Sequence, residues 1–206
     1  RARGRAGPGA GGFGGFGGGG PGGAGGFRAR GPDARYALEI DFLEAVKGAT
    51  KRITLPDGGT LDVKIPEGVE DGQTIRLRGK GGEGYGGGPP GDAMVTLSVR
   101  PHPVFRREGA DIHVTLPITL DEAVLGGKVA APTIDGSVRV TVPECASGGR
   151  TLRLRGRGVA RGQGKGRGDQ FVTLRIVSPP EIDDDLKRFM KEWRETHAYD
   201  PRKGMT

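Results

Sequence analysis

The sequence predicts a mostly β protein with two tandem small antiparallel β-sandwich or open-barrel domains of the same fold, followed by a C-terminal helix. Three observations predict this fold class. Apolar and polar residues alternate in short runs that are typical of strands. One series of short motifs occurs twice at a nearly constant spacing. Only the segment after Pro180 carries apolar residues at an extended helical spacing. We expect a linker at 1–33, a first β domain at 34–103, a second at 104–179, and a C-terminal helix and tail at 180–206.

The N-terminal segment is predicted to be a disordered Gly/Phe-rich linker. Residues 1–31 hold 16 of the 42 glycines, five arginines and no acidic residue. Ordering glycine is costly, and three phenylalanines cannot offset that cost. An alternative is that these phenylalanines dock transiently on a partner. Residues 1–31 carry five of the seven net positive charges, so the rest of the chain is only about +2. The first residue is Arg rather than Met, so we expect the sequence to be part of a longer protein.

The repeat is the most informative internal feature. Glu44–Val46 recurs as Glu122–Val124 at an offset of 78 residues, and Thr74–Gly79 matches Thr151–Gly156 at an offset of 77. A common register over several blocks is not expected by chance. We therefore expect two copies of one fold.

Within the first copy, the period-two pattern gives five short strands. An Asp57-Gly58 turn separates the second and third of them. Leu43–Val46 and its counterpart Glu122–Leu125 are each predicted to form about one helical turn. The expected strands lie at 36–42, 51–55, 61–65, 75–77 and 94–99.

The C-terminal segment is predicted to be an amphipathic helix. Three consecutive aspartates at 183–185 are suited to a helix N-terminus. One interpretation is that the apolar stripe packs on the second β domain. The position of the only Trp beyond a Pro-Pro pair favours the other interpretation, a homodimer contact. The stripe consists of Leu186, Phe189, Met190 and Trp193.

Several kinds of chemistry find no support in the sequence. The single Cys145 and the scattered histidines do not provide a metal site, and no cofactor is expected. Residues 79–84 fit G-x-G-x-x-G, but the Gly/Pro-rich sequence that follows cannot start a helix, so we expect a loop. No nucleophile has a visible base partner, so an enzyme is not expected. No apolar run is long enough to span a membrane. A single cysteine is compatible with a cytoplasmic setting.

The repeated Pro-Glu-x-x-x-x-Gly-x-Thr-(Ile/Leu)-Arg-Leu-Arg-Gly block, the later Gly-Asp pair and Pro101–Phe105 together resemble the DnaJ family of co-chaperones. The resemblance runs from about Tyr36 to Trp193 and is to the C-terminal, client-binding half. The four Cys-x-x-Cys motifs of the zinc-binding subtype are missing, so the chain is similar to the zinc-free subtype that includes the curved-DNA-binding group. The His-Pro-Asp motif of the J domain is also missing. We therefore expect that this chain alone does not stimulate a DnaK-type ATPase.

The resemblance implies binding of unfolded polypeptides and their delivery to a DnaK-type chaperone. In the family, a client segment adds to the second strand of the first domain beside an apolar pocket, which corresponds here to Lys51–Leu55. A free strand edge offers backbone groups to any extended chain, which supports this assignment independently. An alternative is that Ile53 and Leu55 are ordinary core residues. The client-binding residues implied are Tyr36, Leu38, Lys51, Ile53, Leu55 and Phe105.

The second copy serves as an internal control. Its residues at the matching strand are Val129–Thr133, where Pro132 lacks a backbone donor. Ala131 and Thr133 replace Ile53 and Leu55 with smaller side chains. We therefore expect clients on the first copy and a scaffold role for the second.

DNA binding is the competing hypothesis. A basic run in the second copy, rich in glycine, is either a solvated loop or a weak, salt-sensitive DNA contact. Aromatic residues for base stacking are scarce there, which counts against single-strand binding. The candidate DNA-binding residues are Arg153, Arg155, Arg157, Arg161, Lys165 and Arg167.

Overall fold

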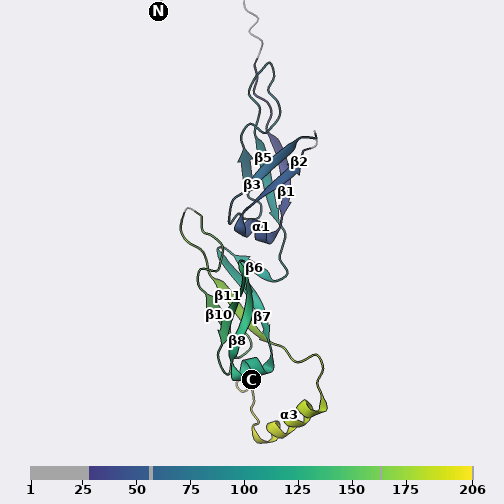
Figure 1. The fold of residues 1–206 in the computed structure, drawn as a ribbon, viewed down its shortest axis with the longest axis vertical. Helices are drawn as coiled ribbons and strands as arrows, with labels where there is room; N and C mark the ends of the chain where they lie inside the picture. Colours follow the sequence, from purple (N-terminus) through teal and green to yellow (C-terminus); the bar gives the residue numbers. More distant parts are fainter. Residues whose placement is uncertain (1–27, 56–57, 163, 206) are drawn as a thin grey trace, which may run out of the picture.

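The computed structural model describes residues 28–55, 58–162 and 164–205. Two β units lie end to end along the long axis, and a helix follows the second unit at the far end (Figure 1). The fold class predicted from the repeat is confirmed. The predicted linker lies almost entirely outside the described residues. No helix in the described ranges is long and apolar enough to span a membrane.

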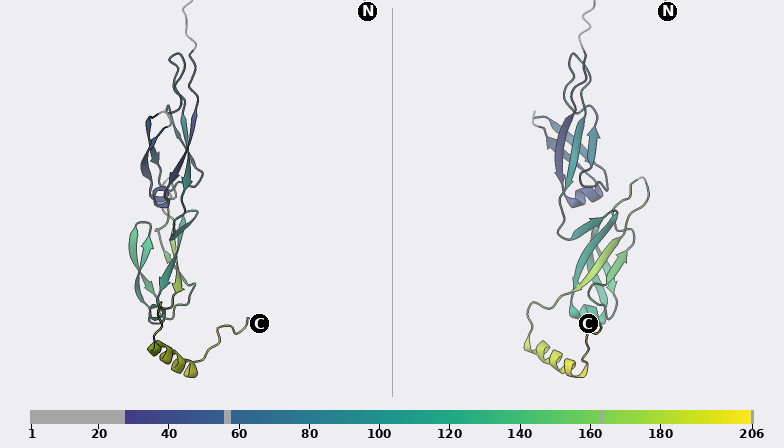
Figure 2. Two further views of the ribbon diagram at one scale, coloured as in Figure 1. Left: turned by 90° about the vertical axis from the view of Figure 1, so that its right-hand side faces the viewer. Right: turned by 180° about the vertical axis from the view of Figure 1, so that it is seen from behind.

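The first unit consists of two layers, a three-stranded sheet with the order β1-β5-β4 and a β2-β3 hairpin (Figure 2). A one-turn helix, α1, lies between β1 and β2. Glu44 and Asp41 form a capping box at its start, which satisfies backbone donors that a helix leaves open. The bounds are β1 Ala34–Ile40, α1 Phe42–Lys47, β2 Ala49–Thr54, β3 Thr60–Ile65, β4 Thr74–Leu77 and β5 Ala93–Val99.

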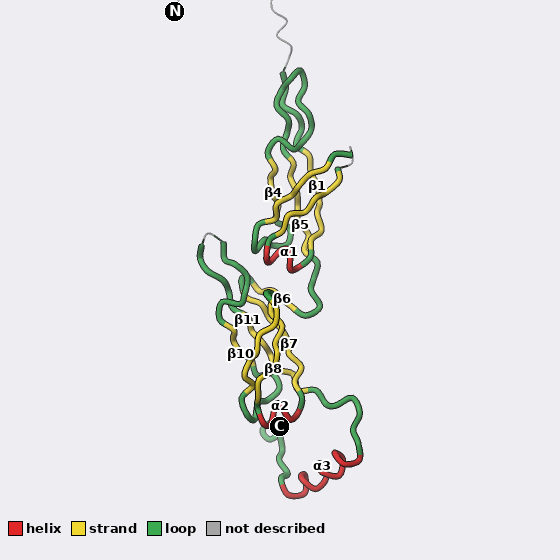
Figure 3. The backbone as a smooth tube through the Cα atoms, viewed as in Figure 1, coloured by secondary structure: helices red, strands yellow, loops and turns green. Residues whose placement is uncertain are grey.

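The second unit repeats this arrangement and adds one strand. Its sheet has the order β10-β11-β7-β6, and its hairpin is β8-β9. The short helix α2 occupies the place of α1 at the lower end of the unit (Figure 3). The extra strand β6 was not predicted. The bounds are β6 Phe105–Glu108, β7 Asp111–Ile118, α2 Leu120–Leu125, β8 Gly127–Thr133, β9 Gly136–Val142, β10 Thr151–Leu154 and β11 Gln170–Ile176.

The sheets are mixed rather than purely antiparallel. β1 pairs with β5 in parallel, and β7 pairs with β11 in parallel. The remaining strand pairs are antiparallel. Parallel neighbours need a long connection, and the helix and hairpin between β1 and β5 provide it. Alternation of side chains in the sequence cannot distinguish the two directions, because both have a period of two.

Each unit repeats one carboxylate-centred network. In the first unit, Asp92 accepts hydrogen bonds from Gly79 N at 2.8 Å and Arg76 Nε at 2.7 Å. In the second unit, Asp169 accepts from Gly156 N at 2.7 Å and Arg153 Nε at 2.8 Å. In both cases these hydrogen bonds lower the pKa of the carboxyl group, and the bond from the backbone N–H has the largest effect. The Gly-Asp pairs that mark the repeat in the sequence are therefore structural.

The two units share a hydrophobic core at their junction. Phe42 and Val46 of α1 belong to the same buried cluster as Phe105, Ile112 and other residues of the second unit. The first unit has its own cluster around Val63, Val95 and Leu97. The first unit therefore contributes its helix to the core of the second.

The C-terminal helix α3 spans Asp184–Thr196, as the spacing of apolar residues predicts. The Asp183 side chain caps it by accepting a hydrogen bond from Leu186 N at 2.7 Å. The helix stands apart from the two β units (Figure 2). None of its residues is fully buried.

Candidate functional site

The free edge of β2 is the central feature of the candidate site. In the described part of the chain β2 pairs only with β3. Leu55 N donates to Gly59 O on the β3 side at 2.7 Å. Backbone groups alternate in direction along an antiparallel pair, so the N–H and C=O groups of Ile53 and Lys51 also face β3. The N–H and C=O groups of Thr50, Arg52 and Thr54 therefore face the free edge.

An apolar strip lies beside this edge, formed by Tyr36 and Leu38 of β1, Ile53 of β2 and the adjoining Leu55. All four residues belong to, or pack against, the core cluster of the first unit. Leu38 is 9% exposed, whereas the other three are half-buried. Ile53 and Leu55 therefore pack against the core of the first unit and are also partly exposed to solvent.

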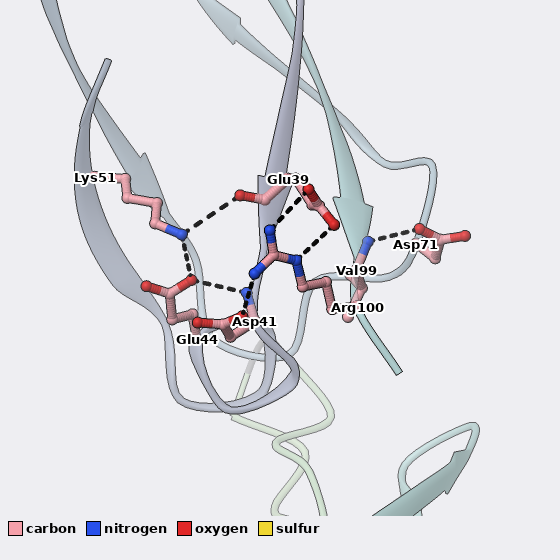
Figure 4. Close-up of polar contacts among 7 residues, drawn as sticks. All are labelled: Glu39, Asp41, Glu44, Lys51, Asp71, Val99 and Arg100. Carbon is pink, nitrogen blue, oxygen red and sulfur yellow. Dashed lines mark hydrogen bonds and ion pairs between the residues drawn. The ribbon is translucent and has the colours of Figure 1, made fainter. Parts of the chain in front are cut away.

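Lys51 is held by the strands and helix around the strip rather than extended into solvent. Its Nζ forms an ion pair with Glu44 Oε2 at 2.7 Å and donates to Glu39 O of β1 at 3.4 Å (Figure 4). The hydrogen bond from Lys51 lowers the pKa of Glu44. These contacts show that β1 and β2 are neighbours across the strip.

Arg100 occupies the other side of this charged cluster. Its guanidinium binds both oxygens of Glu39, at 2.6 and 3.0 Å, and lies 3.6 Å from Asp41 (Figure 4). The hydrogen bond from Arg100 lowers the pKa of Glu39. The end of β5 is thereby anchored where the chain leaves the first unit.

Phe105 does not join the strip. It begins β6 in the second unit, is 7% exposed, and stacks on Phe42 with ring centroids 6.2 Å apart. The family correspondence placed it in the pocket wall, but the structure places it in the core at the junction of the units. The other five implied client-binding residues lie together on the first unit.

The counterpart edge in the second unit is obstructed at Pro132, although β8, like β2, pairs only with its hairpin partner in the described residues. Pro132 lies in β8 at the position that corresponds to Thr54, and it has no backbone donor. Its carbonyl accepts a hydrogen bond from Gln170 Nε2 at 2.7 Å. Gln170 is fully buried, and it replaces Ala93 of the first unit. Ala131 and Thr133 are also buried, so the apolar strip has no open counterpart.

The outer edge of β7 in the second unit is covered by a strand. β6 pairs with it, so that Phe105 lies opposite Val114. In the described residues β1, the counterpart of β7, has no strand on that side. The effect of Pro132 was predicted from the sequence, whereas the roles of Gln170 and β6 were not. The replacement of Ala93 by Gln170 at matching positions of the repeat was the available signal in the sequence for the role of Gln170.

The basic run in the second unit is partly neutralised by carboxylates. Arg153 forms an ion pair with Asp169. Arg167 lies 3.3 Å from Asp135, and Arg161 lies 4.0 Å from Asp111. Among the described residues no ion pair involves the other three cations, which are exposed: Arg155, Arg157 and Lys165.

The apolar stripe of α3 is largely exposed. Phe189 is 59% exposed, Met190 42% and Trp193 38%, while Leu186 is half-buried. Two apolar cavities, of 770 and 640 Å³, lie between α3 and the end of the second unit. Both include Leu120 and Leu186 in their walls.

Within 28–55, 58–162 and 164–205 no group of three His, Cys, Asp or Glu residues could hold a metal ion. Cys145 is an exposed free cysteine.

Comparison with known proteins places this geometry in a family. The model of the DnaJ C terminal domain matches residues 34–179. The Chaperone protein DnaJ 2 of Mycolicibacterium paratuberculosis is 45% identical over 148 residues, which cover 70% of this chain and 38% of that protein. The Chaperone protein DnaJ of Ruminiclostridium cellulolyticum is 39% identical over 175 residues, which cover 78% of this chain and 46% of that protein.

A second group of relatives carries another name. The Curved DNA-binding protein of Coxiella burnetii is 38% identical over 192 residues, which cover 87% of this chain and 60% of that protein. The chain thus spans between 38% and 60% of the length of these three relatives. From the family match and these identities, the chain belongs to the DnaJ family and contains its C-terminal domain.

Proposed function

We propose that this chain binds unfolded polypeptides by adding an extended client segment to the free edge of β2. The observation that carries the proposal is the contrast between the repeats. The first unit offers open backbone groups beside half-exposed apolar side chains. At the same place in the second unit, Pro132 has no N–H, its carbonyl is bound by Gln170, and the matching side chains are buried. Backbone pairing accepts many sequences, and the strip of Tyr36, Leu38, Ile53 and Leu55 favours apolar ones.

The test removes one backbone donor from the free edge. Thr54→Pro copies the residue that the second unit carries at this position, so the fold accommodates proline there. Thr54 N–H points away from β3, and its loss leaves the β2-β3 ladder intact. We expect Thr54→Pro to weaken binding of an unfolded polypeptide at least tenfold. The matched control is Thr54→Val, which keeps the N–H and should bind normally.

The measurement is an NMR titration of the chain with a permanently unfolded polypeptide. Amide signals of β2 should move in the unaltered chain and in Thr54→Val. Equal binding by Thr54→Pro and Thr54→Val would refute edge addition at β2. We further propose that the client passes to a DnaK-type chaperone, which is supported by the relatives named chaperone protein DnaJ.

We also propose that α3 forms a homodimer contact. Three large apolar residues of its stripe are exposed, and the end of the second unit adds Leu120, Val124 and Leu125, which are 44%, 52% and 70% exposed. Leu120 and Val124 correspond to Phe42 and Val46, which are buried against the second unit. The repeat thus indicates that this end of the chain also has a partner surface. A second copy with the same stripe fits it.

DNA binding is a second candidate function, favoured by Arg155, Arg157 and Lys165 and by the relatives named curved DNA-binding protein. Replacing these three residues by Ala should then reduce DNA affinity and flatten its dependence on salt concentration, because fewer counterions are released. Arg153→Ala is not an equivalent change, because Arg153 already pairs with Asp169. DNA affinity that is unchanged in the triple variant would exclude this site.

A further inference from the structure

The segment Pro101–Phe105, which joins the two units, contains a histidine with an unusual set of contacts. Nδ1 of His102 accepts hydrogen bonds from Val104 N at 3.1 Å and from Phe105 N at 3.2 Å. The ring of His102 lies 4.9 Å from the ring of Phe105 and 5.7 Å from that of Phe42. The side chain of His102 therefore contacts its own connecting segment, the helix α1 of the first unit and the strand β6 of the second.

The chain is fixed on both sides of His102. Before it, Arg100 N donates to Ile40 O at 2.9 Å, and the Arg100 side chain binds Glu39. After it, Phe105 begins β6 and is buried in the shared core. Proline on each side of His102 restricts the backbone further. Residues 101–104, which lie between these anchors, belong to no strand. The hydrogen bonds to His102 Nδ1 hold this stretch in a turn.

A second clasp joins the units a few residues later. Arg107 Nη1 donates to Val69 O at 2.6 Å, and Nη2 donates to Gly68 O at 3.1 Å. This clasp depends on where β6 begins, because Arg107 lies two residues after Phe105. The turn at His102 therefore sets the position of Phe105 in the core and of Arg107 on the first unit.

We propose that His102 is a positioning residue that fixes the orientation of the two β units through its Nδ1 acceptor. An unprotonated Nδ1 takes the place of a backbone carbonyl and satisfies two neighbouring N–H groups that face the junction. Asparagine makes the same turn, because its Oδ1 is separated from Cα by the same number of bonds as Nδ1. This inference does not depend on what β2 binds.

Three variants separate this role from simple filling of space. His102→Asn keeps the acceptor and loses the ring. His102→Phe keeps a ring against Phe42 and Phe105 and loses the acceptor. His102→Gln keeps an acceptor but moves it one bond farther from Cα. A positioning role requires that Asn preserves the orientation and that Phe and Gln do not, whereas a filling role requires the reverse for Asn and Phe.

The orientation is measured as a distance distribution between spin labels on the full chain. The exposed native Cys145 labels the second unit, and Ser98→Cys labels the exposed face of β5 in the first. Labelled chain is diluted with unlabelled chain to remove distances between copies. We expect a narrow distribution for the unaltered chain and His102→Asn, and at least a twofold broader one for His102→Phe and His102→Gln. A narrow distribution for His102→Phe, or a broad one for His102→Asn, would overturn the proposal.

Discussion

Replacement of Ile53 by serine tests whether the apolar strip is a binding surface or core. Full burial of an isoleucine side chain contributes roughly 1.5–3 kcal/mol, and Ile53 is half-buried, so Ile53→Ser should cost about 1–2 kcal/mol of unfolding free energy. The two units share a core, so this cost corresponds to a decrease in Tm of about 2–8 °C. The lost contact with a client should reduce affinity by about tenfold.

The assay pairs a thermal melt with a fluorescence titration of an unfolded polypeptide. Val129→Ser is the matched control, since Val129 is a half-buried residue of β8 in the second unit. It should lower Tm by a similar amount and leave client affinity unchanged. A Tm loss typical of a fully buried isoleucine, with about 2–5 kcal/mol lost and normal client binding, would show that Ile53 is core and that the strip is misplaced.

Three further predictions concern the junction, the carboxylate networks and α3. Gly68 has φ +80°, and an added Cβ would lie 2.8 Å from Ala160 O of the second unit, whereas Gly72, with φ +77°, has open space; we expect Gly68→Ala to lower Tm more than Gly72→Ala, and equal losses would contradict a tight junction. The pKa of Asp92 is lowered in the folded state, so the folded chain binds fewer protons than the unfolded chain, and stability should fall as the pH drops through the ordinary carboxyl range near about 4. Urea unfolding midpoints measured against pH should show a smaller loss of stability in acid for Asp92→Asn than for the unaltered chain. An identical pH profile for the two proteins would refute this assignment. Deletion of residues 183–206 should give folded monomers in sedimentation, while an unfolded second unit would show that the stripe of α3 is core.

Local patterns gave a reliable account of the repeated elements. Alternation in Leu61, Val63 and Ile65 predicts β3, and all three residues are buried. Aspartates before the stripe of Leu186 predict α3 and its N-terminus. These features follow from the period of the backbone and from capping, which depend on neighbours in sequence. The free edge of β2 was inferred from the family and from the contrast with Pro132.

Nonlocal contacts account for what the sequence analysis missed. β6 is only four residues long, and it forms because Phe105 packs with Phe42 in the core that the two units share. The bond from Gln170 to Pro132 O joins residues 38 positions apart. The basic run lost three of its six cations to ion pairs with Asp111, Asp135 and Asp169. No local pattern marks such partners, because they are brought together by sheet order.

By itself, the sequence determined that this protein is two copies of one β fold followed by an amphipathic helix, because repeats and periodicity are written along the chain. Only the tertiary structure decided which strand edges have a neighbour and how the copies are joined. An edge is open or closed according to its neighbours in space, as with Gln170 and β6. The junction likewise depends on Phe42, His102 and Phe105, which meet only because α1 of one unit packs into the core of the next.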